Sequence, residues 1–287
     1  MEIAVLADIH GNYVALEKCI DFAKERGIET FMFLGDYVGE LAYPQKAMKM
    51  IYELNDKYNC TFIKGNKENY WIDYRDNGNE SYGWQDKNST TGILLYAYNN
   101  LTAKDLKFFE DLPMNQKVEL KGYESFLICH GSPYKINETM IPNSERIYEI
   151  MDYSETRMII CGHTHEQWKT TYKGKVVLNP GSVGLPILSE GKAQFLILHA
   201  DKDVWEEEFI SLDYDMDAII SDMRKDKLDL HAPFWNYSTE RLLKDGKVSN
   251  GTVLNRVIKL CELEMGSCNW PHIPEKYWVQ AIEEIFG

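Results

Sequence analysis

The stretch Ile3-Ala4-Val5-Leu6-Ala7-Asp8-Ile9-His10-Gly11 decides the fold class, because an apolar run ends directly in polar side chains and a glycine. Such a run predicts a buried strand over residues 3–7. The amphipathic segment that follows predicts a helix over 13–26 that stops at Gly27. The pattern repeats, with strands expected over 31–34 and 60–64 and a helix over 44–56. Strands that alternate with helices predict an α/β protein with parallel pairing and right-handed crossovers.

The rest of the chain departs from this regular alternation. Residues 70–112 form an insertion with many aromatic side chains, which indicates a cap over a site or, equally, a packed surface excursion. Closely spaced strands over 118–210 suggest a second sheet or an antiparallel continuation of the first. From residue 214 the chain is helical. We therefore expect a catalytic domain over 1–212 and a helical C-terminal extension over 213–287 that packs on the core.

One unit recurs along the chain: an apolar strand followed at once by a metal-capable side chain beside a glycine. It appears five times, as Ala7-Asp8-Ile9-His10-Gly11, Gly35-Asp36, Gly65-Asn66, His130-Gly131 and Gly162-His163-Thr164-His165. In open α/β sheets, ligands bind beyond the carboxyl ends of the strands. These side chains are therefore expected to share one crevice.

The donor set predicts a metal centre. Its members are Asp8, His10, Asp36, Asn66, His130, His163 and His165. Mixed oxygen and nitrogen donors without thiolate suit borderline divalent ions. Seven ligands exceed the three that a catalytic zinc typically takes, so the sequence predicts two ions. Manganese is the first candidate, with iron, zinc, nickel, cobalt or magnesium as alternatives.

These blocks carry a resemblance. Asp8-Ile9-His10-Gly11-Asn12, Gly35-Asp36-Tyr37-Val38-Gly39, Gly65-Asn66-Lys67-Glu68, His130-Gly131 and Gly162-His163-Thr164-His165 resemble the five-block signature of calcineurin-like metallophosphoesterases. Asn179-Pro180-Gly181-Ser182-Val183-Gly184 resembles the small bacterial phosphodiesterase branch, and the similarity spans about residues 1–210. The resemblance implies a sandwich of two β-sheets flanked by helices. It also implies that Asp8, His10 and His165 hold one metal, Asn66, His130 and His163 the other, and that Asp36 bridges them.

Lys67 departs from the family pattern, in which a histidine follows the block asparagine and is commonly assigned to the leaving group or to a phosphoryl oxygen. A lysine there could act as a fixed positive charge on the developing oxyanion. It could also donate a proton, because nearby cations lower the pKa of an ammonium group. A third interpretation is weakened catalysis. Of these three interpretations of Lys67, we favour the fixed positive charge.

The resemblance implies a phosphoric ester hydrolase, a phosphodiesterase or phosphatase, that acts through a metal-bridging hydroxide on a small, possibly nucleotide, substrate. The expected catalytic residues are Lys67, Asp36 and Asn66. The expected substrate contacts are Asn12, Arg75, Tyr70 and Trp71, with the aromatic rings stacking on a base and the arginine holding a second phosphate. Two alternatives remain: an enzyme similar to Ser/Thr protein phosphatases, and a catalytically weak metal-binding interaction protein.

Composition limits the partners. The 287 residues carry 31 Lys and Arg against 45 Asp and Glu, a formal net charge of −14, which disfavours broad binding to nucleic acid or to a membrane surface. No apolar run is long enough to span a bilayer and no secretory leader is recognisable, so a cytoplasmic location is expected. The six cysteines show no metal-type or redox-type spacing, and we interpret them as structural. The sequence leaves the oligomeric state open.

Overall fold

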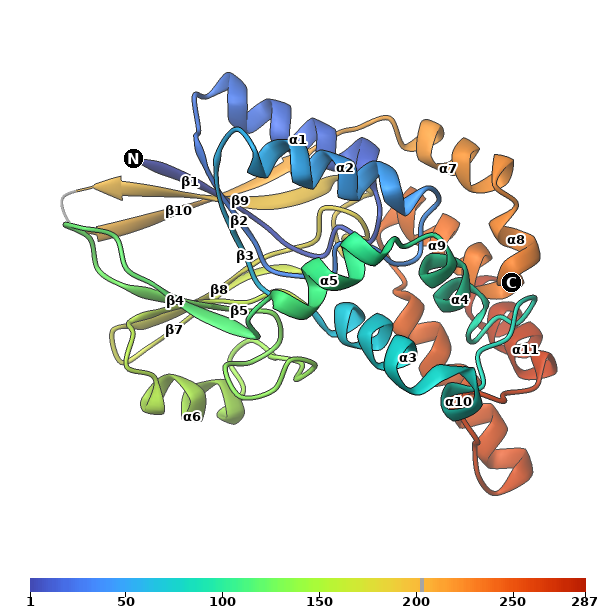
Figure 1. Ribbon diagram of the computed structural model, residues 1–287. Coiled ribbons are helices and arrows are strands. Elements are labelled where there is room, and N and C mark those ends of the chain that lie inside the picture. The colour runs from blue at the N-terminus through green and yellow to red at the C-terminus, as the bar shows by residue number, and fades with distance from the viewer. Residues whose placement is uncertain (202–203) are drawn as a thin grey trace.

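The computed structural model describes residues 1–201 and 204–287, and it contains two five-stranded sheets packed face to face (Figure 1). The first sheet has the order β10-β9-β1-β2-β3. Its strands are β1 (Glu2–Leu6), β2 (Thr30–Phe33), β3 (Asn59–Phe62), β9 (Ala193–Asp201) and β10 (Val204–Leu212). As the sequence predicted, β1, β2 and β3 pair in parallel. The late strands β9 and β10 extend the same sheet antiparallel.

The second sheet has the order β4-β5-β6-β8-β7. Its strands are β4 (Asn115–Val118), β5 (Phe126–Cys129), β6 (Met158–Ile160), β7 (Gln167–Tyr172) and β8 (Lys175–Pro180). Both suggestions for the late strands are thus confirmed, because some form this sheet and others continue the first. The sequence did not predict β7. It is an edge strand with mostly polar residues, and it lacks the apolar run by which the other strands were recognised.

Side-chain alternation in β1 shows how the layers are built. Ile3 and Val5 are buried between the two sheets, whereas Ala4 and Leu6 are buried under the helices on the opposite face. The helices α1 (Tyr13–Glu25) and α2 (Pro44–Asn55) cover that opposite face, and α6 (Glu145–Tyr153) covers the outer face of the second sheet (Figure 1). The predicted two-sheet sandwich flanked by helices is confirmed.

The segment 70–112 contains most of α3 (Asn66–Tyr82), which is kinked at Gly78, and all of α4 (Gly92–Asn99) and α5 (Ala103–Asp111). Much of its aromatic content is packed inward. Trp71 is fully buried in the main core, and Trp84 stacks on Tyr74 with ring centroids 4.2 Å apart. Tyr70 differs, because 37% of it is exposed.

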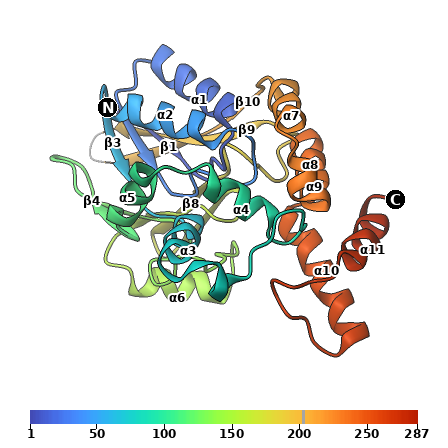
Figure 2. The ribbon, with the colours of Figure 1, turned by 45° about the vertical axis from the view of Figure 1, so that its right-hand side comes forward.

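The C-terminal helices are α7 (Met216–Lys225), α8 (Leu228–His231), α9 (Pro233–Asp245), α10 (Asn250–Met265) and α11 (Glu275–Phe286). The first three contribute to the main core, whereas α10 and α11 share a smaller core of their own at one side of the molecule (Figure 2). The backbone N–H and hydroxyl of Ser89 donate to Glu275 and so tie α11 to the turn before α4. The division into two domains at residue 212 stays a prediction.

Within residues 1–201 and 204–287, no helix combines the length and the apolar character needed to cross a membrane.

Candidate metal centre

The carboxyl ends of five strands converge, as the sequence predicted. Asp8 and His10 follow β1, Asp36 follows β2, and Asn66 begins α3 after β3. His130 follows β5, and His163 and His165 follow β6. The first three strands belong to one sheet and the last two to the other. The centre therefore lies where the same edges of both sheets meet.

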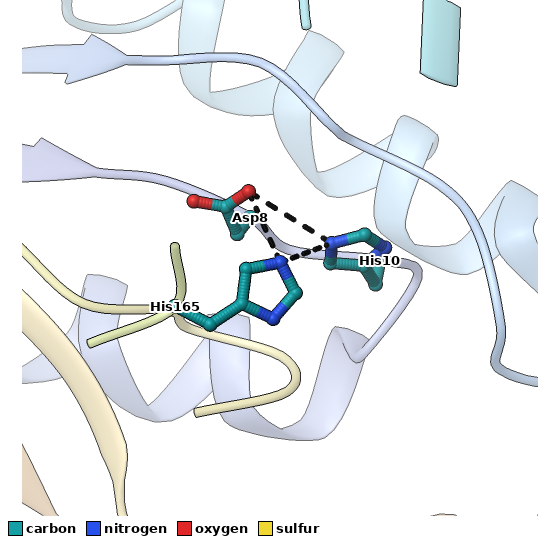
Figure 3. Close-up of side chains that lie close together, drawn as sticks. All are labelled: Asp8, His10 and His165. Atoms are coloured by element: carbon teal, nitrogen blue, oxygen red, sulfur yellow. Dashed lines mark hydrogen bonds and ion pairs between the residues drawn. The ribbon is translucent and has the colours of Figure 1, made fainter. Parts of the chain in front are cut away.

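Asp8, His10 and His165 form one cluster of potential ligands (Figure 3). The Nε2 atoms of His10 and His165 lie 3.0 Å apart. Asp8 Oδ1 lies 3.3 Å from the His165 Nε2 atom and 3.9 Å from the His10 Nε2 atom. These three atoms point toward a common centre, which is the arrangement that one metal ion requires.

A second cluster joins Asp8, Asp36 and His130. The Nε2 atom of His130 lies 3.0 Å from Asn66 Oδ1, so the amide oxygen belongs to the same cluster. The ring of His163 packs against that of His130 with centroids 5.2 Å apart. The structure thus places all seven expected ligands at one centre, in two adjacent groups.

Both carboxylates lie between the two groups. One oxygen of Asp36 is 3.7 Å from His10 Nε2, and the other is 3.6 Å from His130 Nε2. Asp8 Oδ1 lies within 3.9 Å of the Nε2 atoms of His10, His130 and His165. Asp36 spans the two groups as a bridging ligand would, and Asp8 is equally central.

Contacts behind the ligands orient the imidazoles. His130 Nδ1 lies 2.7 Å from the carbonyl oxygen of Leu34, and His165 Nδ1 lies 2.8 Å from that of Leu185. A carbonyl oxygen only accepts hydrogen bonds, so in a neutral ring Nδ1 carries the proton and Nε2 presents a lone pair to the centre.

With the rings in this orientation, the residues of the centre fit a metal ion. In neutral rings, the lone pair of His130 Nε2 faces Asn66 Oδ1, and that of His165 Nε2 faces Asp8 Oδ1. Both pairs bring two acceptors together. Asp8 Oδ1 is also buried and, within the described part of the chain, has no hydrogen-bond donor. Because converging acceptors repel unless a cation lies between them, the donor set suits metal ions.

The backbone is strained at five ligands. Asp8, His10, Asp36, His163 and His165 have φ angles between 50° and 69°, a region that residues with a Cβ rarely occupy. Strain of this kind costs about 1–3 kcal/mol per residue and persists only where surrounding packing enforces it. Its concentration at one centre indicates that the fold is built around the ligand geometry.

The pKa shifts of Asp8 and His163 favour the protonation states that bind metal ions. Burial alone would raise the pKa of Asp8, but the surrounding His165, His130 and His10 outweigh it and hold that pKa well below its usual range. Burial, with a smaller contribution from His130, lowers the pKa of His163 to about 4. At neutral pH the carboxylate is charged and this imidazole is neutral, which are the forms that bind metal.

Glu40 connects the centre to Lys67, and its role was missed from the sequence. One carboxylate oxygen lies 2.6 Å from His10 Nδ1, and the other accepts a hydrogen bond of 2.5 Å from the Lys67 ammonium group. Burial opposes the charge of Glu40, but Lys67 and His10 lower its pKa far below the usual range. Burial likewise opposes the charge of Lys67, but Glu40 and Asp36 raise its pKa. The pair is therefore charged.

Glu68 fixes the turn that carries Asp36, a role that was not predicted from the sequence. Its fully buried carboxylate accepts hydrogen bonds from the backbone N–H groups of Asp36, Tyr37 and Gly65 at 2.8–3.0 Å. Burial, with a further contribution from Asp36, raises the pKa of Glu68 to about 7. No local pattern marks this role, because two of its three partners, Asp36 and Tyr37, lie at the end of a different strand.

A cavity of about 450 Å³ opens onto the centre. Its walls include His10, Asp36, Asn66, Lys67, His163 and His165, together with Trp235 and the first turn of α10.

Of the four residues that the sequence analysis expected to contact the substrate, none lines this cavity. Asn12 caps α1 by accepting from the Ala15 N–H, Trp71 is in the core, and Arg75 pairs with Asp76 and Glu110. Tyr70 lines a neighbouring cavity.

Comparisons with known proteins agree with this geometry. The family model of the calcineurin-like phosphoesterase superfamily domain matches residues 1–203. The uncharacterized protein MJ0912 of Methanocaldococcus jannaschii is 28% identical over 243 residues, which cover 79% of this chain and 93% of that protein.

Two solved structures share the fold. The hypothetical protein PH1004 from Pyrococcus horikoshii is 24% identical with a TM-score of 0.71, and the match covers 86% of this chain and 99% of that one. A metallophosphoesterase from Sphaerobacter thermophilus is 21% identical with a TM-score of 0.66, covering 86% and 100% of the two chains. The family model spans most of the sequence, and the chain therefore belongs to the calcineurin-like phosphoesterase superfamily and is a phosphoester hydrolase.

Proposed function

We propose that the protein is a dinuclear metal hydrolase that cleaves a phosphate ester of a small molecule, with manganese as the first candidate metal. The observation that carries this proposal is the pair of ligand groups that share Asp8, with Asp36 facing both His10 and His130, beside a cavity. Asp8, His10 and His165 would hold one ion. Asn66, His130 and His163 would hold the other, and Asp36 would bridge them. Such ions, when bound, supply Lewis acidity toward the phosphoryl oxygens and acidify a water nucleophile.

The protein supplies a fixed positive charge beside this centre. Lys67 is nearly buried, lines the cavity, and is anchored by Glu40. Its backbone N–H also donates to Asp36 Oδ1 at 2.9 Å, which fixes the residue relative to the ligands. A charge held this rigidly needs little reorganisation when negative charge develops on the ester oxygens. We assign Lys67 to stabilising that charge.

The cavity favours a small anionic substrate. The first turn of α10 lines this cavity, and the N-terminus of a helix carries the positive end of the helix dipole. The molecule as a whole carries a formal charge of −14, so a polyanion across the surface would be repelled while a single phosphate group at the centre is attracted.

Metal removal tests the proposal. We expect the purified protein to bind two divalent ions per chain, to lose turnover of bis(4-nitrophenyl) phosphate and 4-nitrophenyl phosphate on chelation, and to regain it with Mn²⁺. Elemental analysis measures the bound metal, and absorbance assays measure the turnover of the two esters. The resemblance to bacterial phosphodiesterases predicts that the diester reacts faster. A protein that holds two ions and hydrolyses neither ester would instead be a metal-binding interaction protein.

Lys67→Met tests the fixed charge, because methionine keeps much of the side-chain length without the ammonium group. We expect kcat to fall roughly 100-fold, as for loss of one preorganised donor, while metal content stays at two ions. The control Lys57→Met removes an exposed lysine that does not line the metal cavity, and it should leave kcat unchanged. Unchanged kcat in Lys67→Met would contradict the assignment.

A further inference from the structure

A second cavity, of about 460 Å³, adjoins the metal cavity. The two share Asn66, Lys67 and Trp235 in their walls. The second cavity is formed between the segment α3–α4 and the C-terminal helices, because Tyr70 and Trp84 contribute from one side and Leu254 from α10. A substrate group attached to a phosphate at the metal centre would therefore have a separate compartment next to it.

The walls of this compartment are mainly apolar, and five of the lining residues are aromatic. The walls include Tyr70, Tyr82, Trp84, Trp235, Leu254 and Trp270. Trp84, which stacks on Tyr74 and is almost completely buried, gives this compartment a rigid wall, whereas the partly exposed Tyr70 and Trp270 have ring surface that is not covered by the protein. Fixed aromatic faces favour a flat ring system, which can stack with little loss of side-chain entropy.

The charges of the walls exclude an anionic occupant. Among the lining residues that the structure describes, the one cation is Lys67, which the proposed function assigns to the phosphate at the metal centre, so it is not available to a second anionic group. Asp73 adds a carboxylate at the exposed side. Arg75, expected from the sequence to hold a second phosphate, is paired with Asp76 and Glu110 and does not line the compartment. The occupant is therefore uncharged or carries a positive charge.

We propose that this compartment is a specificity subsite for a flat, uncharged aromatic group on the substrate, such as a nucleobase, whose phosphate lies at the metal centre. The proposal rests on the proposed function, and it names the substrate class for that site. Lys67, which lines both cavities, lies between the phosphate and this group. The C-terminal region thus contributes to substrate choice through Trp235 of α9, Leu254 of α10 and Trp270 in the connection between α10 and α11.

A binding experiment tests the subsite without relying on turnover. The ligands are non-hydrolysable phosphonates in which a methylene replaces the ester oxygen: those of adenosine, of ribose and of a simple phenyl group. Calorimetry with Mn²⁺-loaded wild type should show that the adenosine and phenyl compounds bind at least tenfold more tightly than the ribose compound. If the adenosine compound binds more tightly than the phenyl compound, the subsite recognises a nucleobase. If the two bind equally well, the subsite accepts aryl groups in general.

Two variants assign the effect to the subsite. Trp270 is 46% exposed, so Trp270→Ala should leave folding intact while it weakens binding of the aromatic phosphonates roughly tenfold and leaves the ribose compound unchanged. Tyr70→Ala should act in the same direction. The control Tyr153→Ala removes an exposed tyrosine that lines neither cavity and should change nothing. Equal affinity of wild type for the adenosine and ribose compounds would overturn the subsite even if ester hydrolysis is found.

Discussion

Asp36→Asn is expected to reduce bound metal from two ions per chain to one or fewer and to lower kcat/KM by on the order of 10³-fold. The substitution keeps the shape of the side chain but removes the charge that faces both His10 and His130. Removing a group that hydrogen-bonds to a metal ligand already lowers metal affinity or activity roughly 10- to 100-fold, and removing a ligand shared by both ions should lower them further. Elemental analysis and steady-state kinetics measure the two effects.

The matched control is Asp222→Asn, which makes the same change at a mostly buried carboxylate on α7. Asp222 accepts hydrogen bonds from Tyr13 and Lys46 and lines neither cavity. Its variant should keep two ions and wild-type turnover, with at most a modest loss of stability. Full metal content and full turnover in Asp36→Asn would refute the bridging role.

Gly35→Ala is expected to destabilise the fold more than any surface substitution. Gly35 has φ of 93°, and an added Cβ would lie 2.3 Å from the backbone nitrogen of Gly65 and 2.5 Å from its Cα. The left-handed backbone costs about 1–2 kcal/mol for a residue with a Cβ. Separating the ends of β2 and β3 adds about 1–3 kcal/mol of overpacking. We expect the free energy of unfolding to fall by about 2–5 kcal/mol.

The variant Gly27→Ala separates the cost of the left-handed backbone from the cost of overpacking. Gly27 has a similar φ of 76°, but nothing lies within 4 Å of the added Cβ, so only the backbone cost of about 1–2 kcal/mol applies. Urea unfolding with chelator present removes the contribution of bound metal to both values. If both variants lose the same stability, the close approach of Gly35 to Gly65 contributes nothing.

Much of the fold could be predicted from local patterns. The three parallel strands were placed within two residues at each end, and the helix expected over 44–56 begins at the predicted residue and ends one residue earlier. These elements carry strong signals: apolar runs for buried strands, 3.6-residue periodicity for helices, and a proline at the start of α2. Strand β7 lacked such a signal, because an edge strand needs no apolar run.

The residues that line the two cavities were harder to predict than the side chains that gather at the strand ends. Each ligand follows its own strand, so its position along the sequence fixes its place at the sheet edge. Arg75 and Trp71 lie on α3, where one face is buried and another meets solvent, and composition alone does not distinguish these faces. Trp235 and Trp270 reach the second cavity from a distant part of the chain, and no spacing in the sequence links them to it.

Local periodicity and residue type were enough to predict the α/β class, the seven side chains that can bind metal and the lysine beside them, whereas the two-sheet sandwich was implied by the resemblance to the family. The tertiary structure decided which other groups surround that centre. Glu40 and Glu68 act through partners on other strand ends, and the aromatic compartment arises where α3–α4 meet the C-terminal helices. Such contacts join residues far apart in the sequence, so their chemistry exists only after the sheets and helices have packed.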